Sequence, residues 1–102
     1  MQIEHGFVPR EPPEILFHGT GEKSLESILK TGIDKRKRHH VHLSKDLETA
    51  IQIGRRHGKP VVLKVKALEI YRTGYAFFLS DNEVWLTDCV PTAFIEISRG
   101  SI

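Results

Sequence analysis

The nine residues KPVVLKVKA (59–67) carry the clearest β-strand signal in this chain of 102 residues. Valine is frequent here, and its branched Cβ packs well on the pleated surface of a sheet. A helical pattern precedes the strand at KDLETAIQIGRRHG (45–58), and a shorter one follows at ALEIYRTG (67–74). A strand between two helical segments restricts the chain to folds that combine helices with a sheet.

The remaining patterns are shorter. EILFHGT (14–20) predicts a buried strand from about Glu14 to His18 that ends in a glycine turn. GEKSLESILKTG (21–32) predicts a helix, because its apolar residues recur at helical spacing and Gly32 stands where a C-terminal cap belongs. Two or three helices and five or six strands, several adjacent in sequence, predict one small α+β domain with a partly antiparallel sheet. The further strands are expected at 41–43, 75–80, 83–87 and 93–97.

Composition narrows the class of protein. The chain is 39% hydrophobic and 27% charged, which is ordinary for a globular domain. Cys89 is the single cysteine, so no internal disulfide can form, and a reducing compartment is favoured. No apolar run approaches the ~18–20 residues that a membrane helix needs, and the first residues do not resemble a signal peptide. We therefore expect a cytoplasmic protein with no membrane partner.

Positive charge is concentrated in two places. The net charge is only +2, but residues 35–38 and 55–59 hold much of the Lys and Arg. Local basic patches of this kind suggest an anionic partner, while the small total argues against indiscriminate duplex binding. The second patch, within GRRHGKP, is also typical of a helix C-terminus, where cations complement the helix dipole.

The first patch runs directly into histidines in DKRKRHHVHLS (34–44). Three interpretations compete: a solvated basic loop, a metal site, or a site for an anionic substrate. In a strand, His40 and His42 lie on one face and Val41 and Leu43 on the other. Arg38 is the cation nearest the strand and is the candidate to lie close to the sheet.

A metal site is not expected in this segment. Zinc needs three or four ligands with supporting contacts, and the only thiol, Cys89, is distant in sequence. No Cys-x-x-Cys or His-Glu-x-x-His spacing occurs, and four consecutive cations would oppose a divalent ion.

The triplet His18-Gly19-Thr20 is a second candidate site. Gly19 would let a ligand approach the backbone, and Thr20 offers a hydroxyl and an amide. The triplet taken alone favours a plain turn between strand and helix. The chain has no GxGxxG, GxxxxGK[ST] or GxSxG motif, so a nucleotide would have to be held in another way.

Taken in order, five segments resemble the C-terminal lobe of the RNA 2′-phosphotransferase family (KptA type; tRNA 2′-phosphotransferase). The resemblance covers nearly all of residues 2–97 and implies an ADP-ribosyltransferase-like fold, with a split, mostly antiparallel sheet and a cleft for NAD⁺ as co-substrate. It also implies roles in tRNA splicing and RNA repair, and as partners NAD⁺ and a tRNA-like RNA that bears an internal 2′-phosphate. We expect a monomer. The segments are PPEILFHGT, SLESILKTGI, RHHVHLS, TAIQIGRRHGKPVVLKV and GYAFFLSDNEVWLTDCVP.

The resemblance implies a reaction in two steps. The internal RNA 2′-phosphate attacks the nicotinamide ribose carbon of NAD⁺ and expels nicotinamide. The ribose 2″-hydroxyl then attacks that phosphate, which leaves RNA with a 2′-hydroxyl and yields ADP-ribose 1″,2″-cyclic phosphate. Guanidinium groups suit both steps, because they hold phosphate oxygens through paired, permanently charged hydrogen bonds.

The resemblance also implies residue roles. The triplet His18-Gly19-Thr20 matches the family's NAD⁺-contacting His-Gly-Thr, and His42 and Ser44 match the second strand of the NAD⁺ cleft. Arg38 matches a member of the phosphate-binding set and is the predicted catalytic residue. Val84 matches the position at which protein-modifying relatives carry a catalytic glutamate, and a valine suits a nucleophile that is already an anion.

Two departures from the family follow from the same resemblance. Glu83 stands where the family commonly has glycine. The chain also matches one lobe only, so we expect residues 1–102 to be a single NAD-binding domain without the family's N-terminal RNA-binding lobe. Two alternatives stay open: a lobe that binds NAD⁺ or RNA without activity of its own, and an ADP-ribosyltransferase that acts on nucleic-acid phosphates. An RNA-binding module would expose aromatic residues for base stacking, whereas Phe77, Phe78 and Trp85 are expected in the core.

Overall fold

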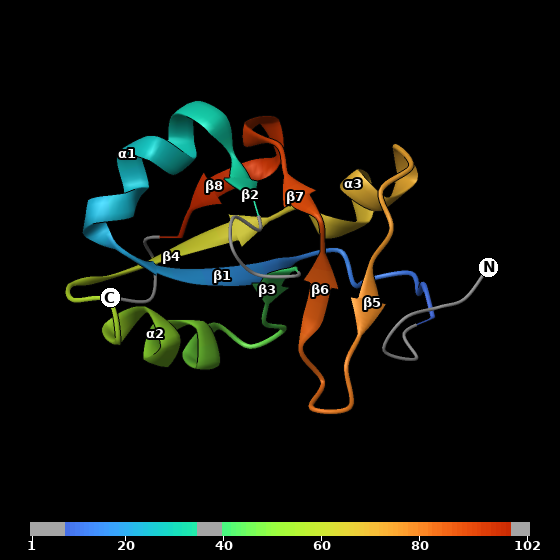
Figure 1. The fold of residues 1–102 in the computed structure, drawn as a ribbon, viewed down its shortest axis with the longest axis horizontal. Helices are drawn as coiled ribbons and strands as arrows, with labels where there is room; N and C mark the ends of the chain where they lie inside the picture. Colours follow the sequence, from blue (N-terminus) through green and yellow to red (C-terminus); the bar gives the residue numbers. More distant parts are fainter. Residues whose placement is uncertain (1–7, 35–39, 99–102) are drawn as a thin grey trace.

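The computed structural model describes residues 8–34 and 40–98 (Figure 1). Within these ranges, three α-helices alternate with eight short strands, which confirms the predicted α+β class. The elements are β1 (Leu16–Gly21), α1 (Glu22–Thr31), β2 (Ile33–Asp34), β3 (Val41–Leu43), α2 (Leu47–Arg55), β4 (Pro60–Val65), α3 (Ala67–Arg72), β5 (Phe78–Leu79), β6 (Trp85–Thr87), β7 (Cys89–Val90), the 3-10 helix η2 (Thr92–Phe94) and β8 (Ile95–Ile97).

The strands form three antiparallel sheets in the described part of the chain. Their orders are β1-β4-β8, β2-β7 and β3-β6-β5. The valine-rich segment is β4, at the centre of the first sheet, and it pairs along the whole of β1. In Figure 1, β1 and β4 cross the middle of the molecule, with α1 on one side of them and α2 on the other.

A single bridge joins the first sheet to the third. The amide of Phe17 donates to the Ser44 carbonyl at 2.7 Å, and the Ser44 amide donates to the Phe17 carbonyl at 2.8 Å. No other backbone pairing joins these two sheets in the described residues, so β1 and the β3 segment diverge beyond this bridge. This arrangement is the split, mostly antiparallel sheet that the family resemblance implies.

The core lies where these sheets and α3 meet. Phe77 is fully buried and Trp85 nearly so, as predicted, whereas Phe78 is half-buried. Phe77 and Trp85 are therefore unavailable for base stacking. The other fully buried side chains include Leu16, Leu43, Leu63, Val65 and Ile70.

The predicted end of β1 is wrong. The strand does not turn at Gly19 but continues to Gly21, because His18 through Gly21 pair in register with Leu63 through Pro60. A turn residue and a strand residue cannot be told apart from the triplet alone, since the pairing partners lie more than 40 positions away in the sequence.

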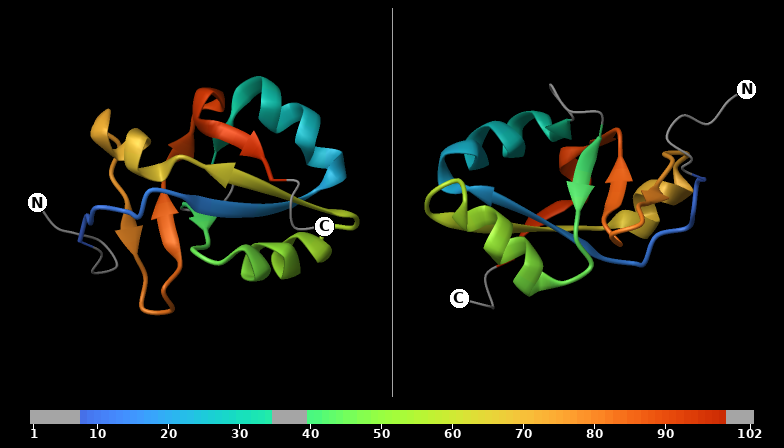
Figure 2. Two further views of the ribbon diagram at one scale, coloured as in Figure 1. Left: turned by 180° about the vertical axis from the view of Figure 1, so that it is seen from behind. Right: turned by 60° about the horizontal axis from the view of Figure 1, so that its bottom comes forward.

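Glycines bring α2 against β1. A methyl group on Gly19 would collide with the carbonyl oxygen of Ala50, and one on Gly21 would collide with the carbonyl of His57. From the helix side, a Cβ on Gly54 would lie 2.9 Å from the Thr20 carbonyl oxygen. Figure 2 shows α2 running alongside β1 in this contact.

Candidate functional site

A cleft of about 580 Å³ opens beside the middle of β1. This volume falls within the roughly 300–1,000 Å³ typical of small-molecule sites. Residues of β1, β2, β3, α1 and the C-terminal end of α2 line it: His18, Gly19, Thr20, Ser24, Ile28, Gly32, Ile33, Asp34, His40, Val41, His42, Ser44, Ile53, Arg56 and His57. Five of the seven residues predicted from the sequence are among them.

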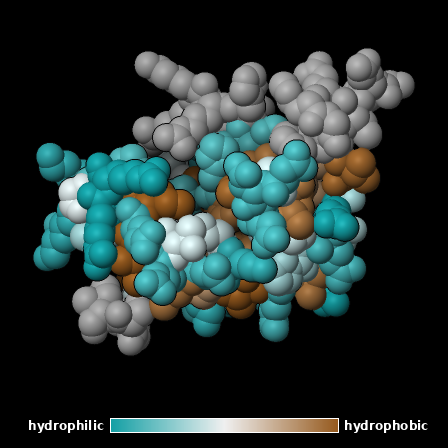
Figure 3. Space-filling view, turned by 90° about the horizontal axis from the view of Figure 1, so that it is seen from below, coloured by the Kyte–Doolittle hydropathy of each residue, from teal (hydrophilic) through white to brown (hydrophobic). Residues whose placement is uncertain are grey.

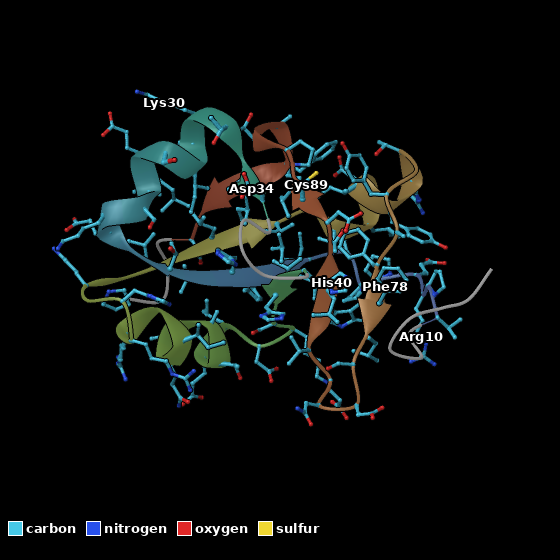
Figure 4. All side chains as sticks on the ribbon, viewed as in Figure 1. Arg10, Lys30, Asp34, His40, Phe78 and Cys89 are labelled. Carbon is cyan, nitrogen blue, oxygen red and sulfur yellow. The ribbon has the colours of Figure 1, made fainter. Side chains whose placement is uncertain are left out.

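The two predicted histidines lie together where the sheets part. The His18 Nδ1 donates to the carbonyl oxygen of His42 at 3.2 Å. The backbone of β3 therefore orients the His18 ring, which belongs to β1. In β3, Val41 and Leu43 are buried while His42 is exposed, which confirms the predicted faces of this strand. His40 directly precedes β3, with its ring centroid 5.8 Å from that of Phe78 (Figure 4).

Two nearly buried residues with hydroxyl groups line the cleft. Thr20 is 7% exposed and Ser44 is 8% exposed, and both line the cavity. Neither side chain forms a hydrogen bond with any group in residues 8–34 and 40–98. No side-chain nitrogen or oxygen in the described residues is both buried and without a partner, so both hydroxyl oxygens are accessible and can bond to a ligand or to water.

Apolar residues form another part of the wall. Ile28, Ile33 and Val41 all belong to the hydrophobic core and also line the cleft. A wall that is apolar on one side and hydroxyl-bearing on another suits a ligand with a flat ring and a polar sugar or phosphate.

The described lining residues carry mostly groups that can be cationic. Four are histidines and one is arginine, against the single carboxylate of Asp34. Figure 4 labels Asp34, the last residue of β2, and His40, which precedes β3. Arg56 is the described lining residue with a permanent positive charge, and it can attract an anionic ligand. Among the residues that the structure describes, no group of three or more His, Cys, Asp or Glu is placed to hold a metal ion.

Arg56 and His57 are the functional candidates that sequence reasoning missed. Their segment matched an ordinary helix C-terminus, but the structure places both in the cleft wall. The local reason is the close approach of α2 to β1, which Gly54 permits. The sequence offered two signals here, the basic patch at 55–59 and a glycine inside a helical pattern, but neither identified Arg56 and His57 as cleft residues.

Two predicted residues are not placed in the cleft. Arg38 lies outside the described residues, so its role stays a prediction. Val84 is half-buried directly before Trp85, its amide donates to the Ser80 Oγ at 3.1 Å, and it is not among the lining residues. Its assignment also stays a prediction.

No helix in the described ranges is both long and apolar enough to span a membrane.

Comparison with known proteins shows the family. Residues 3–89 match the model of the RNA 2′-phosphotransferase, Tpt1 / KptA family. A "Probable RNA 2′-phosphotransferase" of Trichormus variabilis is 50% identical over 97 residues, which are 95% of this chain and 53% of the relative. One of Flavobacterium johnsoniae is 50% identical over 96 residues, 94% of this chain and 53% of the relative.

A third relative, "Probable RNA 2′-phosphotransferase" of Nostoc punctiforme, is 49% identical over 96 residues, which are 94% of this chain and 53% of the relative. The chain thus spans about half the length of the curated relatives it matches. The identity and the family match extend over the strands and helices that build the cleft. This chain belongs to the RNA 2′-phosphotransferase, Tpt1 / KptA family.

Proposed function

We propose that this chain is the NAD⁺-binding lobe of an RNA 2′-phosphotransferase. One observation carries the proposal: Thr20 and Ser44, which bear hydroxyl groups, line one cleft together with His18 and His42. The family membership supplies the reaction class, and the cleft supplies a place for a dinucleotide that needs no Gly-rich phosphate loop.

The residues present fit NAD⁺ as co-substrate. The apolar wall of Ile28, Ile33 and Val41 offers a surface for a flat ring, and the two hydroxyls offer hydrogen bonds to ribose or phosphate oxygens. The His18 ring is already oriented by the His42 carbonyl, which reduces the ordering that binding requires.

In the proposed reaction, an oxygen of the RNA 2′-phosphate bonds to the ribose carbon that carried nicotinamide, and nicotinamide leaves with the bonding electrons. The ribose 2″-hydroxyl then attacks the phosphorus, which frees the RNA 2′-oxygen and forms ADP-ribose 1″,2″-cyclic phosphate. The first nucleophile is an anion, so its attack needs no general base, in accord with an aliphatic residue at Val84. Arg38 would hold the transferred phosphate.

Product analysis tests this function. The chain, alone and fused to the remaining half of the Trichormus variabilis relative, is incubated with labelled NAD⁺ and RNA that bears an internal 2′-phosphate. Nicotinamide and ADP-ribose 1″,2″-cyclic phosphate are the expected products of the fusion. Stable ADP-ribosylated RNA would indicate a transferase that stops after the first step. Intact NAD⁺ in both mixtures would leave a binding lobe without catalysis.

Arginine replacements test the predicted role of Arg38 in the same assay. Arg38→Lys keeps the charge but loses the paired donors, so turnover by the fusion should fall roughly 10- to 100-fold. Arg36→Lys is the matched control and should leave turnover unchanged, because Arg36 is expected to attract RNA only through its charge. Equal turnover by both variants would remove Arg38 from the mechanism.

A further inference from the structure

Two consecutive arginines at the end of α2 differ in their surroundings. Both Arg55 and Arg56 are exposed, and neither forms an ion pair within residues 8–34 and 40–98. Arg56 lines the cleft, whereas Arg55 does not. Seen from below, the face of the molecule that carries α2 is covered largely by hydrophilic side chains (Figure 3).

The backbone around Arg56 is held in place from several sides. The amide of Arg56 donates to the Ile53 carbonyl at 3.1 Å, and the next amide, of His57, donates to Gly54 at 2.9 Å. The contact of the His57 carbonyl with Gly21 fixes this turn against the end of β1. Farther on, the amide of Glu22 donates to the Lys59 carbonyl at 2.9 Å. The arginine therefore projects from a rigid base.

Thr20 lies next to this base. The backbone of Thr20 lies close to Gly54, and its side chain also lines the cleft, on the face of β1 opposite to Gly19 and Gly21, which face α2. Ser24, in the first turn of α1, also lines the cleft. The histidine pair, His18 and His42, meets two residues earlier on β1, which is about 6–7 Å along the strand.

We propose that Arg56 binds the diphosphate of the dinucleotide. This inference rests on the proposed function and adds a diphosphate-binding residue to it. A guanidinium group matches the paired oxygens of a phosphate and stays charged at all physiological pH values. Arg38 is the predicted ligand of the RNA phosphate, so the proposal assigns the two anions to two different arginines.

A simpler role for Arg56 is to complement the α2 dipole. Arg55 would share that role, since it occupies the last residue of the same helix. Loss of either side chain would then lower the thermal midpoint of unfolding by a similar small amount and would leave ligand affinity alone. The neighbouring pair thus provides its own matched control.

Calorimetric titration with ADP-ribose tests the inference on the full chain. Arg56→Gln should weaken ADP-ribose binding roughly 10- to 100-fold, the effect of one to two lost charge-assisted contacts. Arg55→Gln should bind within about twofold of the unsubstituted chain, as expected for a screened surface charge. Arg56→Lys should fall between these values, because it restores the charge without the paired donors. Thermal melts should show all three variants folded.

Three outcomes would overturn the inference. Equal affinities of Arg55→Gln and Arg56→Gln for ADP-ribose would do so while leaving the NAD⁺ site intact. Weaker binding of a 2′-phosphorylated RNA oligonucleotide by Arg56→Gln, with ADP-ribose binding unchanged, would assign Arg56 to RNA instead. Absence of ADP-ribose binding by the unsubstituted chain at millimolar ligand would remove the NAD⁺ site and this inference together.

Discussion

The β1–α2 contact and the β5–β6 hairpin form two contrasting regions near the cleft. In the first, backbone meets backbone and leaves no room for a methyl group on Gly19. In the second, the exposed turn residue Glu83 adopts the left-handed conformation, with φ of 63°, and pairs with Lys45 at 3.3 Å. The comparison suggests that the cleft has one rigid wall, set by packing, and one neighbouring strand pair whose tip tolerates change.

Replacement of Gly19 should have the largest effect. Gly19→Ala forces a methyl group into the carbonyl of Ala50, and we expect it to lower the free energy of unfolding by about 3 kcal/mol, the upper part of the range for overpacking. Urea denaturation measures this change. Gly58→Ala is the control: nothing lies within 4 Å of its added methyl, so its positive φ alone should cost about 1–2 kcal/mol. Equal losses would show that the β1–α2 contact is not the tight region.

A smaller loss is expected inside the strand pair that supports the hairpin. Thr87 is fully buried and its Oγ1 donates to the Ala76 carbonyl at 2.9 Å. Thr87→Val keeps the shape but leaves that carbonyl without its side-chain donor, which should cost about 1–2 kcal/mol in urea denaturation. Thr87→Ser, which keeps the hydroxyl, serves as the control and should retain the hydrogen bond. A neutral Thr87→Val would mean that the whole of this region, and not only its tip, tolerates change.

The rigid wall should separate ligand affinity from stability. Thr20→Val removes a hydroxyl that has no partner in the described residues, so the free energy of unfolding should stay constant or rise. Its affinity for ADP-ribose should nevertheless fall roughly 2- to 12-fold, equivalent to about 0.5–1.5 kcal/mol. Chemical denaturation and calorimetry on one preparation give both quantities. A loss of stability without a loss of affinity would make Thr20 a packing residue.

The hairpin tip should respond least. Glu83→Gly relieves the left-handed backbone, worth about 1 kcal/mol, and loses an exposed ion pair worth about 0.2–1 kcal/mol. The net gain in the free energy of unfolding should therefore be below about 1 kcal/mol. Glu83→Gln, which loses only the charge, should be slightly less stable than the unsubstituted chain. A large loss with Gly would show that the Lys45 pair fixes the tip.

The site was partly predictable because local patterns report local structure. The alternation in Val41-His42-Leu43 gave the correct faces of β3, and Gly32 caps α1 as predicted, with a positive φ of 86° and its amide donating to the Ile28 carbonyl. The two-residue strands β2 and β7 were missed, because Ile33 pairs with Val90 from a distant segment and two residues carry no detectable period. The extension of β1 through Gly19 was missed for the same reason.

The sequence by itself determined the α+β class, the valine-rich centre of the main sheet and the family, since these depend on propensity, spacing and the order of segments. Only the tertiary structure decided that Phe17 and Ser44 join two sheets, and that α2 carries Arg56 into the cleft. These features depend on contacts between residues far apart in the chain. Such contacts depend on how the surfaces of helices and strands pack against one another, and a local sequence pattern contains no information about that packing.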